Sequence, residues 1–342
     1  MEALMITEVG KAELKQIAEP EAGAGQVKIK VGYGGLCGSD LNTFKGLNPL
    51  AALPRIPGHE IGGTIVCSGA DVPEEFAEGK SVIVVPYTEC GDCTACRAGR
   101  KNACRYNKTL GVQQDGGLSN YMVAHHERLI LNDTLSDVQL ALVEPLSVGF
   151  HAIDRASVRE GETVVVLGAG MIGVGAMVGA ISRGARVIAV EVSEEKRETL
   201  LNLGVSEVLN PTKVDVAAEV DRLTDGDGAN VTVEAVGLPI TFRQAVDFAC
   251  FAGRVVYVGY AKEEVSYETK FFNMKELNIF GSRNAIRQDF LDVIAYLEKA
   301  GDKTDALVSK VFKWKDAAQA FDYWDSVRSS TFKVLIDMTD TE

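Results

Sequence analysis

The segment TVVVLGAGMIG, residues 163–173, constrains the fold of this chain more than any other part of the sequence. A run of β-branched residues of strand length leads into a glycine-rich turn, and small and apolar residues of helical length follow. Gly168, Gly170 and Gly173 give the turn the spacing GxGxxG. In such a turn the first glycine permits the bend, the second lets a pyrophosphate approach the backbone, and the third lets helix and strand pack closely. The segment therefore predicts a dinucleotide site at a helix N-terminus.

The region from Thr163 to Ile181 contains nineteen residues without a charge, which is close to the length of a membrane span. Its glycines favour the strand, turn and helix instead. Glu191 closes the next apolar strand, RVIAVE, eighteen residues after Gly173. An acidic side chain there accepts hydrogen bonds from a ribose diol and repels a 2′-phosphate, so NAD is predicted over NADP. Lys196 and Arg197 lie close enough to weaken this preference, although we expect them to lie on the solvated face of a helix.

The chain changes character near Gly161. Before it, short strand-like runs alternate with glycines, prolines and acidic turns, which is typical of an all-β arrangement. After it, apolar strands alternate with helical stretches, which predicts βαβ units and a parallel sheet with helices on both faces. The tail, from Asp289 onward, indicates two helices and a final strand, FKVLIDM. Because 342 residues exceed the usual size of one hydrophobic core, we expect two domains.

The charge of the chain excludes some classes of partner. A formal net charge of −13 would repel a phosphate backbone, and no run of lysine or arginine offsets it. We therefore expect neither nucleic acid nor an anionic membrane as a partner. The N-terminal segment has no basic stretch followed by an apolar run, so we expect no secretory signal and a cytoplasmic protein.

Four of the seven cysteines lie within fifteen residues, in CGDCTACRAGRKNAC. The spacing CxxCxxC, followed by a fourth cysteine eight positions later, lets one loop surround a tetrahedral ion with four thiolates. Because four protein ligands leave no open position, a zinc ion there would be structural. Two disulfides are a competing interpretation that a cytosolic location disfavours, and an iron–sulfur cluster would suit the same ligands. The four residues are Cys90, Cys93, Cys96 and Cys104.

A second set of metal-ligating side chains is more dispersed. Cys37 in GGLCGSD and His59 in PGHEIGG both lie at boundaries between a strand and a loop, and Glu60 follows the histidine. Cysteine, histidine and carboxylate suit a catalytic zinc, which needs about three protein ligands and one open position. Spacing alone does not decide the matter, because a buried cysteine and a satisfied histidine would give the same pattern.

Seven motifs, in this order, resemble one family: GGLCGSD, PGHE, CGDCTACRAGRKNAC, DGGLSNYM, EPLSVGFHA, VLGAGMIG and GSRNA. The resemblance is to the zinc-containing medium-chain dehydrogenase/reductase family, in particular its polyol and sugar-acid branch near sorbitol, L-idonate and L-galactonate dehydrogenases, and it covers essentially the whole chain. It implies an α/β fold. Residues 1–148, with 285–342 returning to them, would form a GroES-like β-rich catalytic domain, and residues 149–284 a Rossmann NAD-binding domain with a doubly wound parallel sheet.

The resemblance also implies two zinc ions and a set of site residues. The catalytic zinc would bind Cys37 and His59 together with a carboxylate, from Glu60 or from Glu144 of EPLSVG. The four clustered cysteines would bind the structural zinc. The residues that would bind or flank the cofactor are Gly168, Gly170, Met171, Ile172, Gly173, Glu191, Lys196, Val236, Gly259, Ser282 and Arg283.

Three further residues bear on proton transfer and specificity. Ser39 fits the hydroxyl with which the family relays the alcohol proton. Asn42 stands where the family commonly has a histidine that passes this proton on, and an amide cannot act as a base at neutral pH. The exit route would then use water, the ribose hydroxyls or another group. Arg283 could instead meet a substrate carboxylate, or lie at the surface.

The reaction that the resemblance implies is transfer of hydride from a secondary hydroxyl of a polyol or sugar acid (aldonate) to NAD, which gives a ketone. Zinc would act as a Lewis acid that lowers the pKa of the alcohol. The sequence does not name the small-molecule substrate, and a threonine 3-dehydrogenase-like or other secondary-alcohol dehydrogenase is an alternative. A non-catalytic dinucleotide-binding sensor of zinc or redox state is a second. The family also implies a homodimer or homotetramer.

Overall fold

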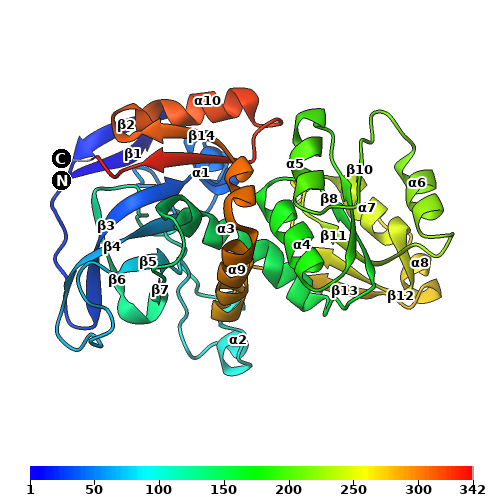
Figure 1. The fold of residues 1–342 in the computed structure, drawn as a ribbon, viewed down its shortest axis with the longest axis horizontal. Coiled ribbons are helices and arrows are strands. Elements are labelled where there is room, and N and C mark those ends of the chain that lie inside the picture. The colour runs from blue at the N-terminus through cyan, green and yellow to red at the C-terminus, as the bar shows by residue number, and fades with distance from the viewer. Residues whose placement is uncertain (341–342) are drawn as a thin grey trace. The chain divides into compact units, whose positions relative to one another are not determined.

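A computed structural model describes residues 1–340 and divides the chain into two compact units (Figure 1). The mixed-sheet unit contains residues 1–144 and 297–328 and the C-terminal segment from Lys333. The parallel-sheet unit contains residues 145–296 and 329–332. The sequence predicts the domains 1–148 with 285–342, and 149–284. These bounds stay a prediction about which parts of the chain fold as independent domains. Within residues 1–340, no helix is both long enough and apolar enough to cross a membrane.

The parallel-sheet unit is built on a six-stranded sheet in which every neighbouring pair of strands is parallel. Its central strands are almost entirely buried, as a sheet covered on both faces requires, and two of them contain the apolar runs VVVL and VIAV. This is the doubly wound sheet that the sequence predicts. The strands, in spatial order, are β10 (Glu207–Leu209), β9 (Arg186–Val190), β8 (Thr163–Leu167), β11 (Ala229–Glu234), β12 (Ala249–Tyr257) and β13 (Asn278–Gly281).

The strand order reverses at β8, which has β9 on one side and β11 on the other. Leu167 at the end of β8 pairs with Glu234, which pairs with Tyr257, which in turn pairs with Gly281. The carboxyl ends of four strands therefore lie along one edge, where open α/β sheets bind their ligands. The helices between and after these strands are α4 (Met171–Ser182), α5 (Arg197–Asn202), α6 (Val216–Leu223), α7 (Pro239–Phe248), α8 (Lys270–Met274) and α9 (Arg287–Ala300).

The mixed-sheet unit contains a seven-stranded sheet and a two-stranded one. Its C-terminal strand pairs antiparallel with β3 and parallel with β14, so the end of the chain becomes an inner strand beside an N-terminal one. Six strands of the larger sheet follow one another in the spatial order β14 (Val308–Lys313), β15 (Lys333–Asp337), β3 (Gln26–Gly35), β4 (Glu60–Ser68), β5 (Ser81–Val84) and β7 (Leu129–Leu131). The seventh strand, β6 (Tyr121–His125), pairs with β3. The smaller sheet is the antiparallel pair of β1 (Glu2–Glu8) and β2 (Lys11–Gln16). The helices are α1 (Gly38–Phe44), α2 (Thr94–Arg97) and α10 (Ala320–Val327).

One long helix, α3 (Asp137–Arg155), begins in the mixed-sheet unit and ends in the parallel-sheet unit. Within the parallel-sheet unit it packs on α4 through glycines. A Cβ at Gly149 would collide with backbone atoms of Ala176 and Ile172, and a Cβ at Gly175 would lie 2.5 Å from the carbonyl oxygen of Leu146. The two helix backbones therefore approach more closely than any side chain larger than hydrogen allows.

We expect Gly149→Ala to lower the free energy of unfolding by about 1–3 kcal/mol, because the added methyl group forces two packed backbones apart. Urea denaturation measures this change. Gly281→Ala is the matched control, since no atom of the described residues lies within 4 Å of the place where its Cβ would stand. A loss for Gly149→Ala that does not exceed the loss for Gly281→Ala would contradict the close packing of the two helices.

Candidate active site

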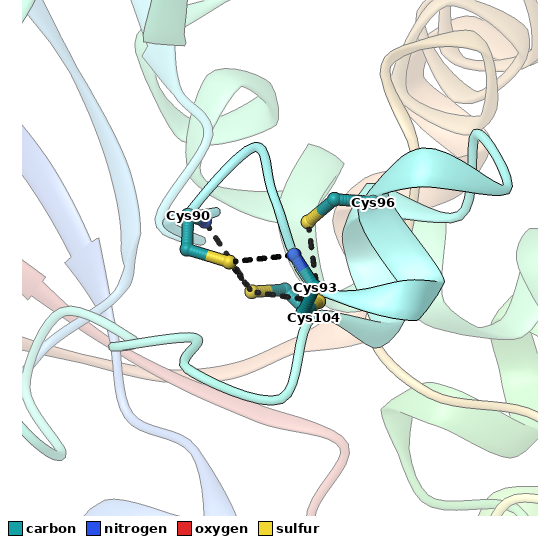
Figure 2. Close-up of side chains that lie close together, drawn as sticks. All are labelled: Cys90, Cys93, Cys96 and Cys104. Atoms are coloured by element: carbon teal, nitrogen blue, oxygen red, sulfur yellow. Dashed lines mark hydrogen bonds between the residues drawn. The ribbon is translucent and has the colours of Figure 1, made fainter.

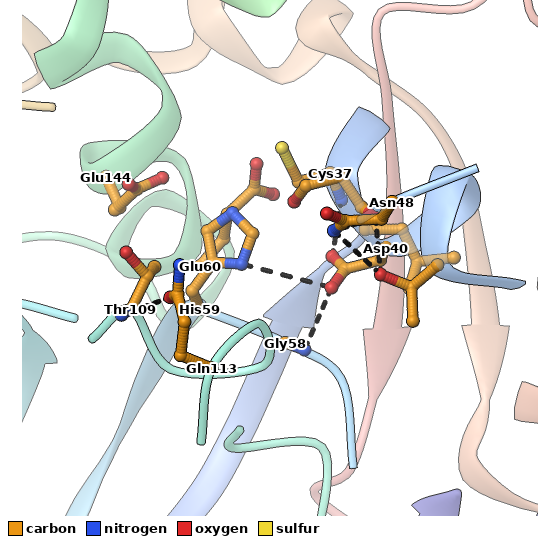
Figure 3. Close-up of polar contacts among 12 residues, drawn as sticks. Cys37, Asp40, Asn48, Gly58, His59, Glu60, Thr109, Gln113 and Glu144 are labelled. Atoms are coloured by element: carbon orange, nitrogen blue, oxygen red, sulfur yellow. Dashed lines mark hydrogen bonds and ion pairs between the residues drawn. The ribbon is translucent and has the colours of Figure 1, made fainter. Parts of the chain in front are cut away.

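The residues Cys37, His59 and Glu60 come together at one end of the mixed sheet. Cys37 follows β3 and precedes α1, whereas His59 and Glu60 lie at the start of β4. The antiparallel pairing of these strands sets Gly35 opposite Glu60. A potential ligand atom of each of the three side chains lies within 4.8 Å of the others (Figure 3). A Cβ at Gly35 would collide with the Glu60 carboxylate, so glycine at that position makes room for the group.

Asp40 lies beside the imidazole of His59 without a hydrogen bond to it. The Asp40 carboxylate accepts hydrogen bonds from the backbone N–H groups of Cys37 (2.9 Å) and Gly58 (3.2 Å), and its Oδ1 lies 3.9 Å from Nδ1 of His59. Burial raises the pKa of the Asp40 carboxyl. Burial opposes a charge on His59 as well, but the negative charges of Cys37 and Asp40 outweigh it and raise the pKa of His59 well above its usual value. The pocket therefore favours positive charge, as a divalent cation would supply.

Lys333, from β15, contacts Glu60 from the opposite side. Its ammonium donates to both carboxylate oxygens of Glu60, each at 2.6 Å, and to the carbonyl oxygen of Leu36 at 3.0 Å. Both side chains are almost fully buried, at 3% and 1% exposure. All three N–H donors of the lysine therefore have partners. Sequence reasoning did not single out Lys333, because a lone lysine in a final strand carries no motif.

Glu144, in α3, lies on another side of the same pocket (Figure 3). Its Oε1 accepts a short hydrogen bond from the hydroxyl of Tyr87, and both residues are buried. Burial, together with the charge of Glu60 and despite that of His59, raises the pKa of Glu144 to about 7. Glu144 does not belong to the group of mutually close donor atoms formed by Cys37, His59 and Glu60. Tyr87 is a second residue that the sequence did not reveal.

Ser39 lies in the first turn of α1, two residues after Cys37. Its hydroxyl is buried, and none of the described residues forms a hydrogen bond with it. Its carbonyl oxygen accepts from the hydroxyl of Thr43 (2.9 Å) and from the amide of Asn48 (3.4 Å). A buried hydroxyl without a protein partner is costly unless a ligand or water completes it. This is the behaviour expected of the predicted proton-relaying group.

The sulfur atoms of Cys90, Cys93, Cys96 and Cys104 form a compact cluster (Figure 2). Three of their separations are 3.5, 3.6 and 3.9 Å, which exceed a disulfide bond and match the edges of a tetrahedron around zinc. Backbone N–H groups point at the sulfurs, as from Cys93 to Cys90 at 3.3 Å. Hydrogen bonds from the backbone of Cys96 and Arg105 lower the pKa of Cys93 to about 6. The two-disulfide interpretation does not fit, because all four cysteines are free.

The glycine-rich turn lies after β8, at the ligand-binding edge of the parallel sheet. Gly168 has a φ of +93°, which favours glycine. A Cβ at Gly173 would collide with the carbonyl oxygen of Gly168, so the third glycine is required for packing. Gly170 is the N-cap residue of α4, directly before Met171 and Ile172. No atom of the described residues lies within 4 Å of the place where a Cβ at Gly170 would stand. The second glycine therefore faces open space.

Glu191, directly after β9, accepts a hydrogen bond from the backbone of this turn. One carboxylate oxygen accepts from the N–H of Ala169 at 2.8 Å and the other from the N–H of Ser193 at 2.9 Å. Lys196 is buried rather than solvated, and its ammonium donates to the carbonyl oxygen of Ala169 at 3.3 Å. The expectation that Lys196 lies on an exposed helix face is therefore wrong. The side chain points back to the turn and not into solvent.

The remaining predicted cofactor residues follow the ends of neighbouring strands. Val236 comes after β11, Gly259 after β12, and Ser282 and Arg283 after β13. Their strands end in register beside β8, so these residues share the edge of the sheet with the glycine-rich turn. The Ser282 hydroxyl is buried, and no described residue forms a hydrogen bond with it. The structure thus brings the predicted cofactor set to one edge of the parallel sheet.

Comparisons with known proteins agree with this architecture. Residues 23–133 match the alcohol dehydrogenase GroES-like domain, and residues 172–299 match the zinc-binding dehydrogenase family. An uncharacterized zinc-type alcohol dehydrogenase-like protein of Haemophilus influenzae is 35% identical, over 92% of both chains. L-galactonate-5-dehydrogenase of Escherichia coli is 32% identical, over 90% of both. An alcohol dehydrogenase of E. coli solved with NADH has a TM-score of 0.91 and 28% identity, over 98% of this chain and 99% of that one.

The chain therefore belongs to the zinc-containing alcohol dehydrogenase family. Like the members of that family it is an oxidoreductase that acts on a CH–OH group with zinc and a nicotinamide cofactor. The GroES-like and Rossmann folds that the resemblance implies are confirmed, and so is the relation to the polyol and sugar-acid branch.

Removing the cation that faces Glu60 tests the geometry of the pocket. We expect Lys333→Met to lower the free energy of unfolding of the metal-free protein by about 3–5 kcal/mol, because it leaves a buried carboxylate without a counter-charge. The double variant Lys333→Met/Glu60→Gln should recover most of this loss. Urea denaturation with a chelator measures both. Equal losses for the single and double variants would show that the two side chains do not interact.

Proposed function

We propose that this protein is a zinc-dependent dehydrogenase that transfers hydride from a secondary hydroxyl of a polyol or sugar acid to NAD and yields a ketone. The observation that carries the proposal is the group of Cys37, His59 and Glu60, whose donor atoms lie within 4.8 Å of one another. His59 and Glu60 are buried, and the buried hydroxyl of Ser39 has no hydrogen-bond partner among the described residues. A similar protein, L-galactonate-5-dehydrogenase, supports a hydroxylated substrate.

Cys37, His59 and Glu60 are the proposed zinc ligands. A thiolate, an imidazole and a carboxylate are donors that a catalytic zinc takes, and three protein ligands leave the fourth position open. Zinc bound there supplies a Lewis acid that lowers the pKa of an alcohol. Of the two candidate carboxylates, Glu60 is preferred as the direct ligand because Glu144 lies outside the group of close donors and is held by Tyr87.

The other residues of the pocket would orient the ligands and move the proton. Asp40, which two backbone N–H groups fix in place, would support a His59 ring that binds the metal through its other nitrogen. Lys333 would orient the Glu60 carboxylate that holds the metal. Ser39 would relay the alcohol proton, accepting it as its own hydroxyl proton passes to the next acceptor. Glu144, which accepts from Tyr87, would hold a water molecule on the open side. Asn42 leaves the exit of the proton to water or to the ribose.

The cofactor assignment rests on the edge of the parallel sheet. Gly170 leaves space for a pyrophosphate at the start of α4, and the carboxylate of Glu191 beside the turn would repel a 2′-phosphate, so NAD is preferred over NADP. Met171, Ile172 and Lys196 would contact the cofactor near this turn. Val236, Gly259, Ser282 and Arg283 would surround the nicotinamide end. The exposed edge strand β13 is compatible with the expected homodimer or homotetramer.

A screen of NAD reduction across alditols and aldonates, with metal counting, tests the proposal. We expect two zinc ions per chain and turnover of at least one polyhydroxy substrate. Cys37→Ser should lose one zinc and lower kcat by at least about a hundredfold, because the metal supplies the Lewis acid. Cys93→Ser should lose the other zinc.

Cys67→Ser is the matched control, since Cys67 is exposed and belongs to neither group of donors. It should keep both ions and its rate. Turnover of L-threonine alone would exclude the polyol assignment, and full activity of Cys37→Ser would exclude the catalytic zinc. Binding of NAD without turnover of any alcohol would favour a sensor.

The glycine-rich turn allows a test of the cofactor site that separates binding from folding. We expect Gly170→Ala to weaken NAD binding by about tenfold or more, because the methyl group fills the space where the pyrophosphate meets the backbone. Its free energy of unfolding should stay within about 0.5 kcal/mol of the starting value. Gly173→Ala should destabilise the fold itself. Calorimetric titration with NAD measures the first effect, and unchanged affinity in Gly170→Ala would place the cofactor elsewhere.

A further inference from the structure

We propose that Gln113 is a specificity-determining residue whose amide N–H groups bind a hydroxyl on the carbon next to the one that is oxidised. The inference rests on the proposed function, and it names the feature that the substrate must carry: a vicinal hydroxyl. Nothing in the sequence motifs distinguishes Gln113 from Gln114, its neighbour in the run GVQQDGG.

The loop that carries Gln113 is fastened to the segment directly before His59. The N–H groups of Gly116, Gly117 and Leu118 donate to the carbonyl oxygens of residues 56, 58 and 57, at 2.7, 2.9 and 3.1 Å. The loop approaches so closely that a Cβ at Gly111 would lie 2.6 Å from the backbone nitrogen of residue 58. Gln113 lies between these anchors, so its backbone is fixed relative to the proposed zinc ligand that follows.

A hydrogen bond to its oxygen fixes the orientation of the Gln113 carboxamide. Its Oε1 accepts from the N–H of Thr109 at 2.8 Å, and its own backbone N–H donates to the carbonyl oxygen of Thr109 at 3.2 Å. With the oxygen held, the NH2 group must point the other way. Figure 3 shows this nitrogen end turned toward the side of the pocket on which Glu144 lies, next to the His59 ring in that view. Among residues 1–340, no protein group accepts a hydrogen bond from it.

The charges around the pocket favour a hydroxyl over a carboxylate as the partner of this group. Asp40, Glu60 and Glu144 are three buried carboxyl groups, and the ammonium of Lys333 is already shared by both oxygens of Glu60. These carboxyl groups would repel a negatively charged group of the substrate at this position. A substrate carboxylate is also better matched by a cation than by an amide. A neutral amide donor suits a neutral hydroxyl oxygen, which both alditols and aldonates offer beside the reacting carbon.

Gln114 provides the matched control. It lies in the same loop and is half-buried like Gln113, but its amide nitrogen donates to the carbonyl oxygen of Lys108 at 3.1 Å. One of its two N–H donors is therefore used within the protein. The two glutamines differ in what their NH2 groups have left to bind, and not in residue type or loop.

The test compares butane-2,3-diol with butan-2-ol, which share a carbon skeleton and differ by the one adjacent hydroxyl. In Gln113→Met, we expect the ratio of kcat/KM for the diol to kcat/KM for the mono-alcohol to fall about three- to tenfold, as for the loss of one neutral hydrogen bond. Gln114→Met should keep the ratio of the starting protein. The dissociation constant of the diol, measured by calorimetry with NADH present, should rise by the same factor in Gln113→Met alone.

Zinc content and melting temperature of both variants show whether the loop and the metal ligands stay in place. An unchanged ratio in Gln113→Met, or an equal fall in both variants, would overturn the inference while leaving the proposed function intact. A starting protein that oxidises neither alcohol nor any polyol would instead refute the proposed function, and the inference with it.

Discussion

The buried ion pair between Lys333 and Glu60 is the interaction on which the active-site half of this protein depends. Two charges leave water at a cost of several kcal/mol each, which is offset only because the ammonium makes three hydrogen bonds and the carboxylate is held at both oxygens. The partners are 273 residues apart. The proposed metal ligands near the N-terminus therefore take their final arrangement only when the C-terminal strand β15 has joined β3, and an N-terminal fragment alone would lack this support.

The sequence predicts the parts of the site that are local. The glycine-rich turn and the four-cysteine loop are each formed by one short stretch of sequence. The spacing of residues within each stretch is enough to explain why glycine or cysteine is needed there. Lys333, Tyr87 and Asp40 were not predicted, because each acts through a partner that only the fold supplies. A signal did exist for Lys333: every residue of KVLID is buried, so its lysine must have a counter-charge. The identity of that counter-charge follows from sheet pairing, which the sequence pattern does not give.

The two proposed metal sites are assembled by different physics. In the cysteine loop, backbone N–H groups of the same loop donate to the sulfurs of Cys90 and Cys104, so the site is prepared by local turns. The group of Cys37, His59 and Glu60 depends instead on the register of β3 against β4, which sets Gly35 opposite Glu60. A slip of one residue in that pairing would turn Glu60 to the other face of the sheet and disperse the donors. The proposed structural site, which four protein ligands would fill, is therefore visible as a dense run of cysteines. The proposed catalytic site, with a free coordination position, is formed by donors that are far apart in the sequence.

Glu191 illustrates how cofactor preference and architecture can share one side chain. Under the proposed preference for NAD its charge would repel a 2′-phosphate, and the same two oxygens also accept hydrogen bonds from the backbone at Ala169 and Ser193. Replacing it with an apolar residue to admit a 2′-phosphorylated cofactor would thus remove the hydrogen-bond acceptor of Ala169, in the turn that is proposed to bind the pyrophosphate. Conversion from the proposed NAD preference to NADP would require two changes: a cation for the phosphate and a substitute acceptor for the freed amides.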